Sequence, residues 1–249
     1  MKALDKSQYV GITETNDPCF NLDLFDNLYD ANIIITKNLS DKLIEKLIEH
    51  KDKCILHFTC TGMGGSKLEP FVPKVEVSVR QMGKLIDLGF PVKQIVLRID
   101  PIVPTEKGLN NAITVLEAFR DYKIERTRIS FLDMYKHVKE RFIENGICLP
   151  YDTFHSDLNL RKESFKKLKD VALLNGYKIV QSCGEPGLES TPCISQMDID
   201  ILGLSDKIEL VDKKGQRDSC GCPSNKRQLI SWEKSKKKCG HNCLYCYMK

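Results

Sequence analysis

Strand-like and helical segments alternate along this chain, and that alternation is the feature that most limits its fold. Six short runs rich in β-branched residues predict strands at 9–12, 32–35, 54–58, 95–99, 128–132 and 177–180. The runs are apolar on both faces, which is typical of parallel strands buried under helices. The sequence therefore predicts an α/β fold, a partial (β/α)6 barrel, with functional residues at the carboxyl ends of its strands.

Amphipathic helices are predicted between the strands. Ser40 is expected to cap the first, whose apolar face includes Leu43 and Leu47. Three later apolar stripes have the period of a helix, at 75–86, 113–119 and 165–172. Gly89 and Gly176 are expected to end the first and last of these. We expect the apolar positions to form the core, and we predict a weaker helix near 195–202.

The chain is expected to form one compact domain built from two parts. Residues 1–182 are predicted to form the barrel core, and residues 183–249 are predicted to form a Cys-rich extension that folds back over the barrel mouth. The N-terminus lacks a secretory signal, and no apolar run approaches the roughly 20 residues that span a bilayer. A cytoplasmic location and no membrane partner are therefore expected.

The chain contains 11 cysteines, an odd number, in a sequence without an export signal. Cysteines in this context are expected as metal ligands rather than as disulfides. The formal net charge of +4 is too small to indicate nucleic acid as a partner.

Three cysteines close the chain at C-x3-C-x2-C spacing. Cys239, Cys243 and Cys246 form the motif, and Tyr245 stands directly before the third cysteine. An electron-transfer 4Fe-4S cluster is ordinarily held by four cysteines, so three leave one iron without a protein ligand. That iron can bind a substrate or cofactor, and the motif therefore predicts a reactive cluster.

This motif resembles the C-x3-C-x-aromatic-C signature of radical S-adenosylmethionine enzymes, with Tyr245 at the aromatic position. The resemblance implies a 4Fe-4S cluster on the three cysteines, with S-adenosylmethionine bound to the open iron. It also implies cleavage of the cofactor to a 5′-deoxyadenosyl radical and an electron donor such as a flavodoxin or ferredoxin. Most members of that superfamily carry the motif near the N-terminus, so their other cofactor-binding motifs cannot be mapped here by order.

A smaller group of these enzymes carries the cysteines last, and this chain is similar to that group over most of its length. The similar segments are 36–38, 58–62, 68–70, 98–102, 130–136, 215–217, 220–222 and the cysteine tail. Within the group the chain resembles the queuine lyases. This implies a small-molecule lyase of queuosine salvage that releases 7-aminomethyl-7-deazaguanine from queuine. Segment 13–18 departs from the Arg-rich start of the wider family, which indicates a divergent substrate subgroup.

Polar side chains at the ends of predicted strands are candidates for binding the substrate and the cofactor. The candidate carboxylates for the substrate are Asp100, Asp133 and Glu185. A carboxylate there can accept two N–H groups from the pyrimidine edge of a deazaguanine base. The candidates for the carboxylate and ribose of the cofactor are Thr36, Lys37, Thr59, Thr61, Arg98 and Lys136. Arg98 and Lys136 are candidates for the substrate as well, and Tyr245 of the tail is a further candidate for binding the cofactor. Each residue is equally well explained as a cap or a solvated side chain.

A second set of cysteines includes a C-x-C pair, a spacing that favours metal binding. The set is Cys183, Cys193, Cys220 and Cys222. One interpretation is an auxiliary cluster or a structural zinc ion. The other is four reduced thiols, some of them buried as small apolar side chains.

Two other function classes fit parts of the sequence. The lysine-rich segment 234–238 fits a radical enzyme that acts on nucleic acid and resembles spore photoproduct lyase, and it also fits a solvated tail. His241 as a fourth ligand beside the tail cysteines would make a zinc site, and the chain would then be a zinc-stabilised binding protein without enzymatic activity.

Overall fold

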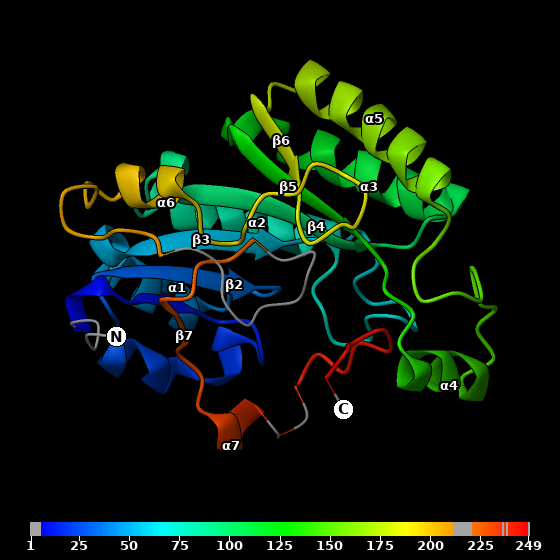
Figure 1. The fold of residues 1–249 in the computed structure, drawn as a ribbon, viewed down its shortest axis with the longest axis horizontal. Coiled ribbons are helices and arrows are strands. Elements are labelled where there is room, and N and C mark those ends of the chain that lie inside the picture. The colour runs from blue at the N-terminus through cyan, green and yellow to red at the C-terminus, as the bar shows by residue number, and fades with distance from the viewer. Residues whose placement is uncertain (1–5, 212–220, 236, 238, 249) are drawn as a thin grey trace.

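A seven-stranded parallel sheet forms the centre of the molecule (Figure 1). The computed structural model describes residues 6–211, 221–235, 237 and 239–248. The strands are β1 (Val10–Ile12), β2 (Ala31–Thr36), β3 (Cys54–Thr59), β4 (Ile95–Ile102), β5 (Arg126–Phe131), β6 (Ile179–Ser182) and β7 (Lys226–Gln228). Their order is β6-β5-β4-β3-β2-β1-β7, so β7 pairs with the outer edge of β1 and the two edge strands are β6 and β7.

Helices connect the strands. They are α1 (Asp41–Glu49), α2 (Val75–Asp87), α3 (Glu106–Phe119), α4 (Lys136–Glu144), α5 (Leu158–Leu174), α6 (Gln196–Ile201) and α7 (Trp232–Ser235). The Ser40 hydroxyl accepts a hydrogen bond from the Leu43 N–H and caps α1. Gly89 (φ +91°) and Gly176 (φ +89°) adopt left-handed backbone after α2 and α5. The cap and both helix ends confirm the sequence-based predictions.

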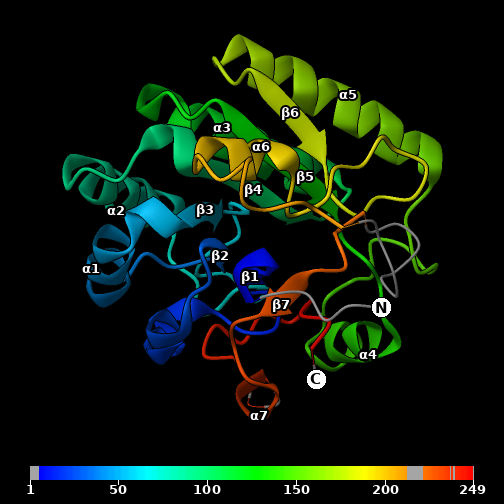
Figure 2. The same ribbon diagram turned by 60° about the vertical axis from the view of Figure 1, so that its left-hand side comes forward.

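The two faces of the sheet pack against different parts of the chain. Ile34 and Leu56 face the outer side and share the larger core with α1, α2, α3 and α5. Ile33 and Ile55 face the inner side and pack against residues 193–208, which include α6. This division follows from the strand period, because successive side chains point to opposite faces. Figure 2 shows α6 on the inner side of the curved sheet and α1 and α2 on the outer side.

The end of the C-terminal extension returns to the carboxyl edge of the sheet. The Leu244 N–H donates to the Leu68 carbonyl at 3.0 Å. Tyr245 is buried in a third apolar cluster with Met63, which follows β3, and Phe142 of α4. The extension therefore has two roles: residues 193–208 fill the inner face, and the tail covers the strand ends.

The predicted α/β fold is confirmed, with a parallel sheet and alternating helices as in a partial α/β barrel. Each of the six predicted strands overlaps an observed one, and the helix predicted near 195–202 corresponds to α6. Strand β7 was not predicted, because its residues Lys-Arg-Gln are polar and lack the apolar pattern of a buried strand. It forms through pairing with β1 over all three of its residues.

Candidate metal centre and cofactor site

The cysteine tail is fixed against the loop after β3 and against α4. The Cys246 N–H donates to the Cys243 carbonyl at 3.2 Å, and Arg141 of α4 donates to the Cys246 carbonyl. Gly240 lies against the ring of Phe20, where a Cβ would come within 2.5 Å of a ring carbon. A side chain at position 240 would therefore require the ring of Phe20, which is 51% exposed, to move aside.

The three tail thiols are partly buried and lie close enough for the charge on one to influence another. Burial raises the pKa of the Cys239 thiol. Burial also raises the pKa of the Cys243 thiol to about 12, and the positive charge of Lys37 opposes this shift. Metal binding at these positions would have to displace the thiol protons.

The spacing of the tail sulfurs decides what kind of metal group fits them. Within the described residues, Cys239, Cys243 and Cys246 do not form a group whose ligand atoms all lie within 4.8 Å of one another. Thiolates on one zinc ion, with Zn–S bonds of about 2.3 Å, can lie no more than about 4.6 Å apart. A polynuclear cluster interposes iron and sulfide between its ligand sulfurs, so the wider spacing suits a cluster better than a single ion.

A buried ion pair lies beside Cys243. Lys37 follows β2, and its Nζ is 3.1 Å from Glu69 Oε1, while Nζ also donates to the Asp100 carbonyl at 3.2 Å. Glu69 is fully buried and accepts hydrogen bonds from Thr61 Oγ1, at 2.6 Å, and from the Tyr245 hydroxyl. Lys37 Nζ lies 5.4 Å from the centre of the Tyr245 ring. The structure thus brings together Lys37, Thr61 and Tyr245, which the sequence singled out, around Glu69, which it did not.

Asp17 is the second buried carboxylate at this edge, and it ties the tail to β2. It accepts hydrogen bonds from Thr36 Oγ1 at 2.6 Å and from the Lys37 N–H at 2.8 Å, and His241 Nε2 lies 2.9 Å from it. Burial alone would raise the Asp17 pKa, but the hydrogen bond and charge of His241, helped by Thr36 and Lys37, hold it below its ordinary value.

His241 contacts acceptors at both ring nitrogens, with Nδ1 lying 3.2 Å from the carbonyl of Phe71. Its closest potential metal-ligating neighbours in the described residues are Asp17 and Cys19, not the tail cysteines. The structure therefore does not assemble the zinc site of His241 with Cys239, Cys243 and Cys246 that the sequence left open.

Four of the predicted cofactor residues lie at the carboxyl edge, whereas Arg98 lies in the middle of β4 and Lys136 begins α4. Thr36, Lys37, Thr59 and Thr61 are at or just beyond the ends of β2 and β3, and the three threonines are buried. Lys136, at the start of α4, has 93% of its side chain exposed and lies 4.0 Å from Glu140. Lys136 is thus the member of this set that projects into solvent.

The predicted substrate carboxylates have different surroundings. Asp100 pairs with Arg98, and Asp133 lies 2.8 Å from His155 Nδ1 with both side chains about one third exposed or less. Glu185 is buried, and it accepts hydrogen bonds from Ser130 at 3.0 Å and Arg161 at 3.1 Å.

Burial raises the Glu185 pKa, although hydrogen bonds from Phe131, Ser130 and Arg161 oppose the shift. The contacts of Glu185 join β5, α5 and the loop after β6, so this carboxylate has a structural task that the sequence did not reveal.

The second set of cysteines gathers on the inner face of the sheet. Cys183 Sγ lies 3.3 Å from Cys193 Sγ, and the Cys193 N–H donates to Cys222 Sγ at 3.3 Å. Hydrogen bonds from Cys183 and Cys222, aided by two arginines, hold the pKa of the Cys193 thiol well below its usual value despite burial. Cys220, the fourth predicted member, lies outside the described residues, as does segment 215–217.

The lysine-rich segment is only partly described. Lys234 pairs with Asp23, and its carbonyl and that of Lys237 accept hydrogen bonds from Asn16. Lys236 and Lys238 lie outside the described residues. The segment is therefore connected to the body of the protein at Lys234, and nucleic-acid binding by it stays a prediction.

Sequence reasoning missed three acidic or basic partners of the predicted site residues: Asp17, Glu69 and His155. Glu69 stands in segment 68–70, which carries part of the family resemblance. That resemblance could have marked Glu69 as a site residue. Asp17 lies in segment 13–18, where the chain departs from the wider family, and nothing in the sequence pattern linked His155 to Asp133.

Together the fold and the tail define an α/β protein with a parallel sheet and a cysteine-rich candidate metal site near its C-terminus. The model of the family described as Domain of unknown function (DUF1848) matches residues 14–248. The chain belongs to this family, and the match includes both the sheet and the cysteine tail. No curated protein shows a significant match to the chain. Within the described residues, the helices are too short or too polar to cross a membrane.

Proposed function

We propose that this protein is a radical S-adenosylmethionine lyase whose 4Fe-4S cluster is bound by Cys239, Cys243 and Cys246. The observation that carries the proposal is the position of these thiols. They lie at the carboxyl edge of a parallel sheet, not all within 4.8 Å of one another, beside the buried network of Lys37, Glu69 and Tyr245. Soft thiolate ligands suit iron–sulfur clusters, so the donor set fits the group. When bound, the cluster and S-adenosylmethionine would supply a 5′-deoxyadenosyl radical.

The charges beside Cys243 suit the amino-acid end of S-adenosylmethionine. That end carries one carboxylate and one ammonium group. Lys37 and Glu69 present one positive and one negative charge at the same edge, and Lys37 is near enough to Cys243 to lower the pKa of its thiol. In this proposal Lys37 orients the cofactor carboxylate, and Glu69 holds Lys37 and the Tyr245 hydroxyl in place. Thr59 and Thr61 border the same space.

The substrate is proposed to be queuine, recognised through its deazaguanine base. Asp133 follows β5 and is only partly buried, so its carboxylate can accept N–H groups from a pyrimidine edge while His155 orients it. Asp100 with Arg98 is the other candidate pair at the strand ends. A flavodoxin or ferredoxin is proposed to deliver the electron.

The decisive experiment uses anaerobically reconstituted, reduced protein with S-adenosylmethionine and queuine. We expect about four iron atoms per chain, 5′-deoxyadenosine, and 7-aminomethyl-7-deazaguanine as products. Cys239→Ala, Cys243→Ala and Cys246→Ala should each abolish cofactor cleavage and reduce bound iron. Cys148→Ala is the matched control, because Cys148 is exposed and outside the tail.

The outcomes separate the class from the substrate. If the three tail variants cleave S-adenosylmethionine as fast as the parent, the proposed cluster site is wrong. If 5′-deoxyadenosine forms and the aminomethyl base does not, the radical class stands and queuine is excluded as the substrate.

A further inference from the structure

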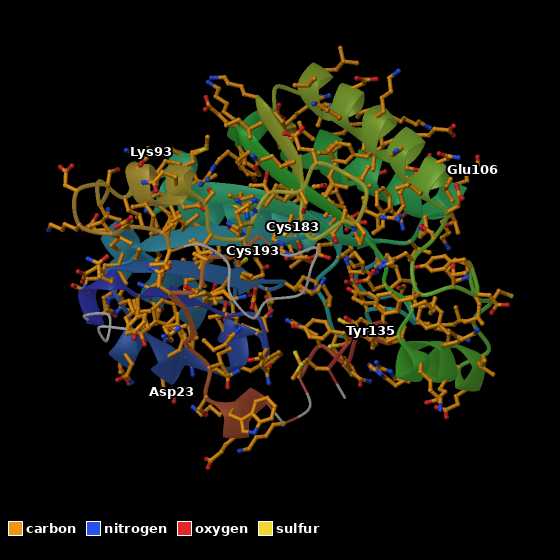
Figure 3. The ribbon with its side chains drawn as sticks, viewed as in Figure 1. Asp23, Lys93, Glu106, Tyr135, Cys183 and Cys193 are labelled. Carbon is orange, nitrogen blue, oxygen red and sulfur yellow. The ribbon has the colours of Figure 1, made fainter. Side chains whose placement is uncertain are left out.

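A second group of thiols lies where the two edges of the sheet approach each other. Cys183 directly follows edge strand β6, Cys193 lies in the loop before α6, and Cys222 precedes edge strand β7. Figure 3 shows Cys183 and Cys193 next to each other against the inner face of the sheet. Cys193 contacts Cys183 through its sulfur and Cys222 through its N–H, each at 3.3 Å. It therefore connects segments next to the two edge strands.

Glu14 adds an oxygen ligand to this group. Its carboxylate and the sulfurs of Cys193 and Cys222 all lie within 4.8 Å of one another. Lys226 and Gln228 of β7 hold the carboxylate through Oε2, at 2.9 and 3.1 Å. Thiolates in a tetrahedral zinc site lie roughly 3.8 Å apart. The inner group therefore has the scale of a single-ion site, which the tail cysteines lack.

The neighbouring arginines carry buried donors that the protein does not satisfy. Arg98 Nη1 donates to Cys193 Sγ at 3.7 Å. Arg98 Nε and Arg128 Nη1 have no hydrogen-bond partner among the described residues, although the two residues are only 6% and 2% exposed. An unsatisfied buried donor costs about 1–3 kcal/mol. Two such donors indicate a negatively charged group beside Cys193.

The charged side chains on the inner face of the sheet also indicate a negatively charged group beside Cys193. Three arginines face two carboxylates, namely Arg98, Arg126 and Arg128 with Asp100 and Asp198. Among these five described residues one positive charge is left over, while Lys226 is paired with Glu14. Buried charge is stable only when it is compensated. A divalent ion with three thiolates carries one negative charge, which matches the remaining arginine charge, and the carboxylate of Glu14 is balanced by Lys226.

We propose that Cys193, Cys222 and Glu14 bind one structural zinc ion that fastens the two edges of the open barrel together. Cys183, 3.3 Å from Cys193 but outside the 4.8 Å group, would turn its side chain inward to serve as the fourth ligand. The ligands follow β1 and β6, or lie in the loop before α6 and in the segment that precedes β7. Such an ion would hold the C-terminal extension on the inner face. A four-iron auxiliary cluster would need its ligand sulfurs farther apart. This proposal does not depend on the proposed function of the tail.

The test measures zinc and iron per chain in the purified full-length protein by mass spectrometry. We expect about one zinc ion per chain in the parent. The Cys193→Ser and Cys222→Ser variants should retain less than about a tenth of it. Cys148→Ser, at an exposed thiol, should retain all of it. The variant with Cys239→Ala, Cys243→Ala and Cys246→Ala should lose iron and keep zinc, which separates this site from the tail.

Cobalt substitution keeps the test decisive if a cysteine variant does not fold. The parent with Co²⁺ in place of zinc should show thiolate-to-cobalt charge-transfer absorption. Glu14→Gln should keep that absorption, shift the ligand-field bands and weaken cobalt binding. A folded parent with neither zinc nor this absorption overturns the proposal, as does a Cys193→Ser protein that keeps its zinc. Extra iron that is lost on Cys193→Ser would show a second cluster and also overturn it.

Discussion

Lys37 and Glu69 are 32 positions apart in the sequence and form a 3.1 Å ion pair at the carboxyl edge of the sheet. The Glu69 side chain is fully buried, and that of Lys37 is 18% exposed. Through Glu69 the pair also contacts Tyr245, so it connects β2, the loop after β3 and the cysteine tail. The ion pair is therefore a structural support for the candidate metal centre as well as a candidate cofactor contact.

Removing one partner of this pair should destabilise the protein strongly. Glu69→Gln leaves a mostly buried ammonium group without its counter-charge, and we expect the free energy of unfolding to fall by about 3 kcal/mol. The control is Glu140→Gln, which removes the exposed partner of Lys136 and should cost about 0–1 kcal/mol. Urea unfolding of the metal-free proteins measures both, and equal losses would contradict a buried ion pair.

The loop that carries Glu69 requires a glycine at position 64. A Cβ at Gly64 would lie 2.0 Å from the Pro73 carbonyl oxygen, a backbone atom that cannot move aside easily. We expect Gly64→Ala to reduce the free energy of unfolding by about 1–3 kcal/mol and to reduce iron retained by the tail.

The matched control for the glycine variant is Gly221→Ala. Among the described residues, a Cβ there would find its nearest atoms in Pro192, at an ordinary 3.7 Å, and should change stability by less than about 0.5 kcal/mol. Thermal unfolding and iron analysis of the two variants test this difference. If Gly64→Ala behaves like Gly221→Ala, the loop is more adaptable than its packing indicates.

The fold was predictable from the sequence because its signals are local. Six strands and the cap at Ser40 follow from periodicity and from single residues such as Gly89, whose left-handed backbone ends a helix. Strand β7 was not predictable, because its pairing with β1 comes from residues more than 200 positions away. The cysteine tail carries its own signal in its spacing.

The partners of the site residues were harder to predict. Lys37 and Thr61 were candidates because they follow strands, but their shared partner Glu69 lies in a loop with no regular pattern. Glu185 follows a strand in the same way as Asp133, yet buried contacts with Arg161 and Ser130 already engage it. Position after a strand indicates the edge of the sheet, and only the three-dimensional contacts show which side chains remain open to a ligand.

A buried histidine should make stability depend on pH. His57 of β3 is fully buried, and within the described residues neither ring nitrogen has a hydrogen-bond partner. Burial lowers the His57 pKa well below 6.5, and the charges of Arg128, Arg98 and Arg126 add to this, while Cys193 opposes the shift. The unfolded chain therefore takes up a proton below pH 6.5 that the folded protein does not bind.

Stability should fall as the pH drops below 6.5 toward the lower folded pKa. For each pH unit below 6.5, the free energy of unfolding should fall by about 1.4 kcal/mol until the pH reaches the folded pKa. Between pH 7.5 and 5.5 the free energy of unfolding of the parent should fall by about 1.4 kcal/mol more than that of His57→Leu. The variant cannot take up this proton. Urea unfolding at the two pH values measures the difference. The same pH dependence in both proteins would show that His57 is not the group responsible.

Asp133 and Glu185 allow substrate binding to be distinguished from structural support. Glu185→Gln removes the charge partner of buried Arg161 and should reduce the free energy of unfolding by about 3–5 kcal/mol. Asp133→Asn keeps a hydrogen-bonding side chain next to His155 at a partly exposed position, so it should change stability by less than about 1 kcal/mol. If Asp133 accepts the pyrimidine edge of queuine, its variant should instead raise the KM for queuine by about tenfold or more, since a hydrogen bond to a charged group contributes about 1.5–3 kcal/mol.

The measurements are urea unfolding and the KM for queuine, with the KM for S-adenosylmethionine as the internal control. Asp133→Asn should leave that control unchanged, because Asp133 is not among the residues placed beside the tail. A rise in the KM for queuine that appears only in Glu185→Gln would reverse the assignment. In that case the base would bind against β6 rather than beyond β5, and Arg161 would belong to the substrate site.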